Sequence, residues 1–150
     1  MASLPVIPSA DSDTWSLAEG SIEGRPSVIR FRPTLKEFLG DARYPRRLQI
    51  TWTFQGDGQS GMPSSDESEA MESLEDLLVP AFERAEAGLL AFVFTHGGNR
   101  EWHFYVSASV NLGAVVNDAL ASSPALPIEL NVKDDPEWSE IAGLLESVSR

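Results

Sequence analysis

Two short patterns in the sequence could support chemistry, and the first is a possible phosphate loop. Residues 56–61 read GDGQSG, a G-x-G-x-x-G pattern that in dinucleotide-binding proteins joins a strand to a helix N-terminus. Here Met62 and Pro63 separate the last glycine from the helix expected next, and that helix opens with acidic side chains that would repel a phosphate. No Lys followed by Ser or Thr completes a Walker loop. The pattern therefore predicts a connecting loop and no nucleotide cofactor.

The second pattern consists of the histidines and an acidic run that could bind a metal ion. His96 and His103 are the only histidines, and two imidazoles without a third convergent ligand make a poor metal site. Asp134, Asp135 and Glu137 suit the N-terminus of a helix, and they lack the alternation of a calcium loop. Cysteine is absent, which removes thiolate chemistry and disulfides. We expect no metal, no cofactor and no catalytic residue.

The composition is that of an acidic globular protein. The net charge of the 150 residues is −12, which disfavours nucleic acid and anionic membrane surfaces as partners. The longest apolar run, Gly88 to Phe94, is too short to span a bilayer, and the N-terminus does not resemble a secretory signal. We therefore expect a cytoplasmic protein that binds neither nucleic acid nor membrane.

The periodicity of apolar residues predicts an α+β fold. From Arg47 onward the order is strand, helix, strand, strand, helix, strand, which is the ferredoxin-like βαββαβ arrangement with two helices on one face of an antiparallel sheet. An N-terminal strand at Pro26 to Phe31 and a short helix after Asp135 are additions that the pattern does not place. We expect residues 1–14 to be a flexible tail and residues 15–150 to form one domain. The βαββαβ strands are expected at 47–54, 89–95, 100–107 and 127–133, and the helices at 66–88 and 110–121.

The sheet face away from these helices is the surface that the predicted fold leaves open. Alternation along the strands places His103 and Tyr105 on it, and Thr51 and Thr53 on a neighbouring strand. With Arg100, these residues are the candidate binding site, because ferredoxin-like modules often bind partners through this face. The other interpretation is that the N-terminal strand or a second subunit covers it.

Three blocks of sequence resemble a known family: GMP at Gly61 to Pro63, REWHFYVS at Arg100 to Ser107, and DDPEWSEI at Asp134 to Ile141. From about Trp15 to Leu145 the chain resembles the domain of unknown function 695 family. The resemblance implies a small cytoplasmic bacterial protein with no assigned chemistry. Some members look related to the regulator of ribonuclease E activity B, an acidic ferredoxin-like protein that acts by binding another protein. The resemblance transfers no catalytic residue.

These observations favour a soluble, non-enzymatic module that binds or regulates another protein, and a basic partner would suit its charge. The alternative is a small-molecule binder or hydrolase with a pocket near His103, Tyr105 and Arg100. A homodimer in which two sheets pack together is a third hypothesis. Whether the protein is an enzyme is not decided by the sequence.

Overall fold

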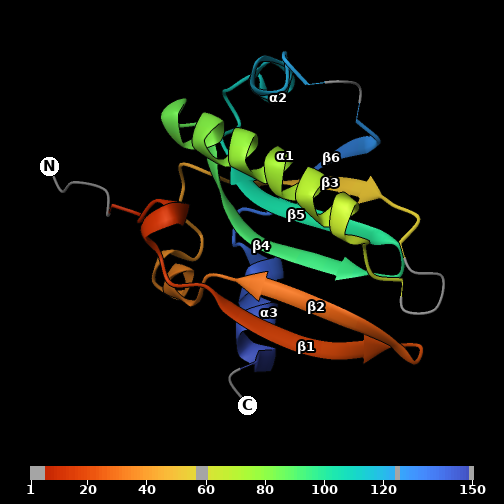
Figure 1. The fold of residues 1–150 in the computed structure, drawn as a ribbon. Coiled ribbons are helices and arrows are strands. Elements are labelled where there is room, and N and C mark those ends of the chain that lie inside the picture. The colour runs from red at the N-terminus through yellow and green to blue at the C-terminus, as the bar shows by residue number, and fades with distance from the viewer. Residues whose placement is uncertain (1–5, 57–60, 124–125, 149–150) are drawn as a thin grey trace, which may run out of the picture.

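The computed structural model describes residues 6–56, 61–123 and 126–148, and its six strands form one antiparallel sheet (Figure 1). The expected α+β class is confirmed, and the strand order is β1-β2-β4-β5-β3-β6. None of the described helices is long and apolar enough to cross a bilayer. The strands are β1 (Ser16–Ile22), β2 (Arg25–Phe31), β3 (Arg46–Thr53), β4 (Gly88–His96), β5 (Asn99–Val106) and β6 (Ile128–Asp134). The helices are α1 (Ser65–Arg84), α2 (Leu112–Ala119) and α3 (Ser139–Val148), with short 3-10 helices η1 (Ala10–Ser12) and η2 (Pro33–Phe38).

Helix α1 lies across one face of the sheet, and α2 packs beside it (Figure 1). A capping box fixes its start: Ser64 Oγ accepts the N–H of Glu67 at 3.2 Å, and Glu67 Oε1 accepts the N–H of Ser64 at 2.9 Å. The helix ends at Arg84, and Glu86, with a φ of 50°, takes the left-handed position expected for Gly88. Gly88 instead begins β4, where a Cβ would lie 2.4 Å from a backbone carbonyl oxygen of β5. The core on this face includes Leu48, Ile50, Trp52, Leu74, Leu78, Phe82, Trp102 and Phe104.

The sheet is wider than the four strands expected, because β1 and β2 extend it beyond β4. Strand β1 follows directly on the N-terminal segment and pairs with β2 from Ser16 opposite Phe31 to Ile22 opposite Arg25. The two-residue connection is Glu23-Gly24, with φ values of 53° and 81°. Positive φ at both central residues marks the type I′ turn that matches the twist of a hairpin. Most of the G-x-G-x-x-G pattern, at residues 57–60, lies outside the described residues.

Helix α3 covers part of the opposite face, so the expectation that this face is open is wrong there. Its N-terminus is held by Asp135, whose carboxylate accepts the N–H groups of Ser139 at 2.8 Å and Glu140 at 3.3 Å. Pro136 lies in the turn before the helix rather than at its first position. Trp138 in the same turn is fully buried against the sheet. The second core includes Phe31, Leu35, Leu89, Phe92, Tyr105, Trp138 and Ile141.

A buried ion pair fastens the N-terminal segment to the sheet. Arg32 Nε donates to Asp13 Oδ2 at 2.8 Å, and both side chains are almost completely buried. The same guanidinium donates to the carbonyl oxygens of Leu90 at 3.0 Å and Pro8 at 2.5 Å. Ala10 is buried in the α1 core. The segment assigned to a tail on sequence grounds is therefore packed from Ala10 to Asp13.

Candidate binding site

His103 and Tyr105 lie beneath α3 rather than on an exposed surface. His103 is 4% exposed, its Nδ1 accepts a hydrogen bond from Arg47 Nη1 at 2.8 Å, and its Nε2 donates to Glu101 Oε1 at 2.9 Å. The hydroxyl of Tyr105 donates to Asp135 Oδ2 at 2.8 Å, and its ring stacks on that of Trp138. Tyr105 joins the sheet to the α3 region, and the hydrogen-bond partners of His103 belong to the sheet, so neither side chain is free to contact a partner.

The hydrogen bonds set the protonation states of this buried network. Arginine donates and does not accept, so His103 must leave Nδ1 unprotonated and carry its proton on Nε2. Burial lowers the pKa of His103 more than the Glu101 carboxylate raises it, which keeps the imidazole neutral. Burial also raises the pKa of the Tyr105 hydroxyl far above its ordinary value. Both groups therefore keep the protonation states that their structural hydrogen bonds require.

We expect acid to weaken the fold through His103. Because the folded-state pKa lies below the unfolded one, the unfolded chain binds the proton more tightly. The contribution of the neutral ring is complete above the unfolded pKa of about 6.5 and is lost as the pH falls from there through the folded-state pKa. Urea unfolding at about pH 7.5 and about pH 5.5 measures the loss. In His103→Gln, whose amide also accepts and donates, this pH dependence should shrink, and an unchanged slope would contradict the assignment.

The other three predicted binding residues do not form one site with this pair. Thr51 is half-buried and Thr53 is exposed, on the part of the same face that α3 leaves uncovered, and Thr53 Oγ1 donates to Asn99 Oδ1 at 2.9 Å. Arg100 lies on the opposite face, where its Nε donates to Thr95 Oγ1 at 2.9 Å. Grouping Arg100 with His103 is therefore wrong, because odd and even positions of a strand point to opposite faces. A binding role for Thr51 and Thr53 stays a prediction.

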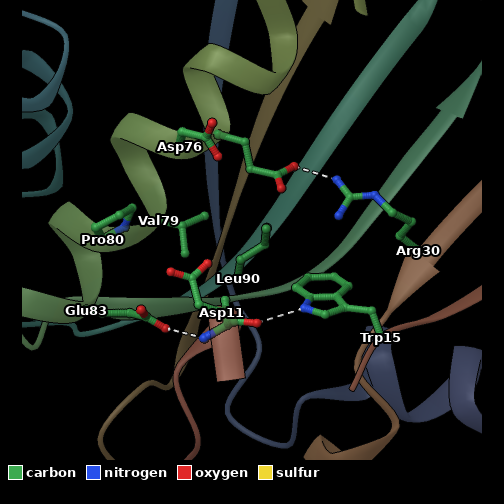
Figure 2. A pocket seen from close by; sticks show the side chains of 10 residues that line it. Asp11, Trp15, Arg30, Asp76, Val79, Pro80, Glu83 and Leu90 are labelled. Carbon is green, nitrogen blue, oxygen red and sulfur yellow. Dashed lines mark hydrogen bonds and ion pairs between the residues drawn. The ribbon is translucent and has the colours of Figure 1, made fainter. Parts of the chain in front are cut away.

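A pocket of about 300 Å³ lies on the α1 face, between α1, η1 and β2, and we call it the acidic pocket (Figure 2). In Figure 2 the carboxylate of Asp11 points from η1 toward Val79 of α1, and Trp15 and Arg30 close the side toward the hairpin. The acidic side chains that line it are Asp11, Glu75, Asp76 and Glu83, and the other lining residues are Ala10, Trp15, Arg30, Val79, Pro80 and Leu90.

Contacts between distant segments fix the walls of the acidic pocket. Glu75 Oε1 pairs with Arg30 Nη2 at 2.5 Å, and the Arg30 guanidinium lies 5.2 Å from the centre of the Trp15 ring. The indole N–H of Trp15 donates to the carbonyl oxygen of Ala10 at 3.0 Å. Glu83 Oε2 accepts the N–H of Ala10 at 2.9 Å. Ala10 is thus bound on one side to Trp15, just before β1, and on the other to α1, and the hollow between them is preformed.

The residues that line the acidic pocket carry a net negative charge. Four carboxylates face one guanidinium, that of Arg30, which leaves a formal charge of −3. Asp11 and Asp76 are exposed. Among the residues that the structure describes, no three His, Asp or Glu side chains gather closely enough to hold a metal ion. Carboxylates spread around an aromatic ring suit an extended organic cation, such as the side chains of lysine and arginine.

The acidic pocket could not be predicted from the sequence, because its lining residues come from four separate segments. Asp11 lies in the residues assigned to a tail, and the 3-10 turn that carries it was not predicted. Trp15 and Arg30 become neighbours only through the β1–β2 pairing. The sequence predicts the helix that carries Glu75, Asp76 and Glu83, but it does not indicate which elements pack beside them.

The comparisons with known proteins identify a family and no individual relative. No curated protein and no solved structure matches the chain. The model of a family described as a family of unknown function, DUF695, matches residues 13–142. This span includes all six strands, α1, α2 and the Asp13–Arg32 pair, while Asp11 lies outside it. The chain therefore belongs to the DUF695 family.

Proposed function

We propose that the protein is a non-enzymatic binding module whose acidic pocket receives basic side chains of a partner protein. The observation that carries this proposal is the formal charge of −3 around a preformed hollow beside Trp15, on a chain with a net charge of −12. A field of this sign attracts a basic partner over distance, and the pocket gives it a defined place to bind.

The side chains of the pocket argue for binding rather than catalysis. Its walls carry carboxylates, one guanidinium and apolar groups, with neither a histidine nor a hydroxyl that could act as a nucleophile with its base. The small-molecule or hydrolase alternative needed one pocket at His103, Tyr105 and Arg100. The first two are buried beneath α3 and the third lies on the other face, so this alternative has no site.

We also propose that β3 to β6 with α1 and α2 form a ferredoxin-like unit, to which the β1–β2 hairpin and α3 are additions. The support is the order β4-β5-β3-β6, in which the first and third strands of the unit are the inner ones. A cytoplasmic location in a bacterium and a relation to the regulator of ribonuclease E activity B stay predictions.

Neutralising the exposed carboxylates of the acidic pocket should weaken binding of a basic peptide. The probe is a fluorescent lysine octapeptide, measured by anisotropy at low salt. The double variant Asp11→Asn, Asp76→Asn should bind it about three- to tenfold more weakly, since each exposed charge contact contributes up to about 1 kcal/mol. The affinity should fall as salt is raised.

The control removes the same number of charges elsewhere. Asp118→Asn with Glu129→Gln changes exposed residues of α2 and β6. This control should bind the peptide within about twofold of the unchanged protein, because only long-range attraction is lost. Equal losses in the two double variants would show that net charge alone attracts the peptide and that the pocket has no part in it.

A further inference from the structure

Strand β1 is an edge of the sheet with little protection against pairing, since Glu19 is its only charged residue. Its seven residues pair with β2 without a bulge, contain neither proline nor lysine, and leave Leu17 58% exposed. The other edge, β6, carries Glu129, Lys133 and Asp134 within the same length. Charged residues, proline and bulges are the features that keep edge strands from pairing with other chains. The contrast marks β1 as the edge that is free to accept another strand.

The hairpin geometry identifies which backbone groups of β1 face outward. In a two-residue hairpin the residues that flank the turn, here Ile22 and Arg25, exchange both of their hydrogen bonds. Alternate residues back along the strand therefore bond to β2, and those between them direct their N–H and C=O groups away from the sheet. The outward-facing residues are Leu17, Glu19 and Ser21.

Two hollows lie beside the start of β1, one on each face of the sheet. Trp15 lines the acidic pocket on the α1 face. The next residue, Ser16, lines a groove of about 570 Å³ on the opposite face, between η2 and α3. Most of the groove is apolar, and its lining includes Phe31, Leu39, Ala142, Leu145 and Val148. A strand added beside β1 would direct alternate side chains toward these two surfaces.

We propose that the partner binds as an extended segment that adds to β1 as a seventh strand, with basic side chains on the α1 face and apolar side chains on the groove face. On the α1 face the added strand would lie beside Glu19, next to the wall of the acidic pocket. On the other face its apolar side chains would cover the groove. Backbone hydrogen bonds give such a complex its affinity, and the alternate side chains give it selectivity.

Charge selects a basic partner over a second copy of this chain. Two copies paired through β1 would bring together two molecules that each carry a net charge of −12. A segment of alternating lysine or arginine and apolar residues meets both faces with matching chemistry. The inference rests on the proposed function in requiring a basic partner, and it adds the edge of β1 as the place of contact.

The test uses a fluorescent octapeptide of alternating lysine and valine, capped at both ends, and the same peptide methylated at its central amides. The methylated peptide keeps every side chain but cannot pair as a strand. We expect it to bind the unchanged protein at least about fivefold more weakly, the result of losing one or two backbone hydrogen bonds. Equal binding of the two peptides, or binding of neither, would overturn strand addition.

A matched pair of protein variants tests the same edge by changing the protein instead of the peptide. Glu19→Pro and Glu19→Ala both remove the charge, but only proline removes an outward N–H, at a position where an edge strand tolerates it. Proline should weaken binding of the unmethylated peptide at least about fivefold relative to alanine, with circular dichroism confirming that both variants fold. Equal binding by the two folded variants would overturn the proposal.

The two proposals fail in different ways. If Asp11→Asn with Asp76→Asn weakens binding while methylation of the peptide has no effect, the acidic pocket stands and strand addition is wrong. If methylation abolishes binding and the pocket variant has no effect, strand addition stands and the pocket proposal is wrong. Sedimentation that shows a dimer of the unchanged protein and a monomer of Glu19→Pro would overturn the proposal in favour of a second copy at β1.

Discussion

Replacing Asp13 with alanine should lower the free energy of unfolding by about 3–5 kcal/mol, the usual cost of removing one partner from a buried ion pair. Asp13 accepts hydrogen bonds from Arg32 at 2.8 Å, Thr34 at 2.7 Å and the N–H of Thr14 at 2.8 Å. Without it, the completely buried guanidinium of Arg32 would keep only two carbonyl oxygens as acceptors. Urea unfolding followed by far-ultraviolet circular dichroism measures the change.

Two further variants separate the charge from the loss of a side chain. Asp11→Ala makes the same change two residues away at an exposed position, and it should shift the stability by no more than about 0.5 kcal/mol. Combining Asp13→Ala with Arg32→Met removes both charges and should cost less than Asp13→Ala alone. If Asp13→Ala cost no more than Asp11→Ala, the ion pair would not be what holds the N-terminal segment to the sheet.

This ion pair also explains why the sequence did not predict the packing of the N-terminal segment. Asp13 and Arg32 are nineteen residues apart and belong to no local pattern. Strand β1 was missed because its sequence, SLAEGSI, combines Gly, Ser and Glu with few large apolar residues. The Glu23-Gly24 turn gives only a weak signal, since a type I′ turn usually contains asparagine or aspartate before its glycine.

The elements with strong periodicity were predicted well. Strand β3 alternates between large apolar and polar side chains, and α1 carries an apolar stripe with a capping box, so local sequence was enough to define each. The C-terminal end of α1 differs from the prediction. The helix ends at Arg84, and Glu86 takes the left-handed conformation that was expected for Gly88. Such boundaries depend on how the following strand packs, which local periodicity does not record.

The part of the open face that α3 covers could have been recognised from the sequence. Strand β4 reads GLLAFVFTH, with apolar residues at consecutive positions, and nearly every side chain in it is buried. A strand of this kind is covered on both faces, whereas an alternating strand is covered on one. The bulk of Trp138, three residues after the capping Asp135, was a second indication that α3 packs on the sheet.

Because α3 covers this part of the face, the candidate site lies on the other face of the sheet, beside α1. With His103 and Tyr105 committed to structural hydrogen bonds, the exposed acidic groups that gather around a hollow are those of η1 and α1. The hairpin that widens the sheet also brings Trp15 and Arg30 into contact. The additions to the βαββαβ pattern, which the sequence could not place, therefore build the surfaces on which both binding proposals rest.

Replacing Trp138 with alanine should destabilise the protein by about 3–5 kcal/mol, as expected for truncation of a large core aromatic residue. Its side chain is completely buried and stacks on Tyr105 with ring centres 4.5 Å apart. The indole N–H donates to the carbonyl oxygen of Tyr44 at 2.8 Å, and alanine would leave that partly buried acceptor without this donor. Urea unfolding followed by circular dichroism measures the loss, since three other tryptophans would mix their signals in fluorescence.

The backbone conformation at Trp138 makes it informative to compare a glycine variant with the alanine variant. Trp138 has a φ of 57°, a left-handed conformation that costs a residue with a Cβ about 1–2 kcal/mol and glycine nothing comparable. In an ordinary strand or helix, glycine is less stable than alanine by about 0.5–1 kcal/mol. At this position Trp138→Gly should instead unfold at the same or a higher urea concentration than Trp138→Ala. If glycine were the less stable of the two, the turn that places Trp138 against Tyr105 would not be left-handed, and the way Asp135 starts α3 would need another explanation.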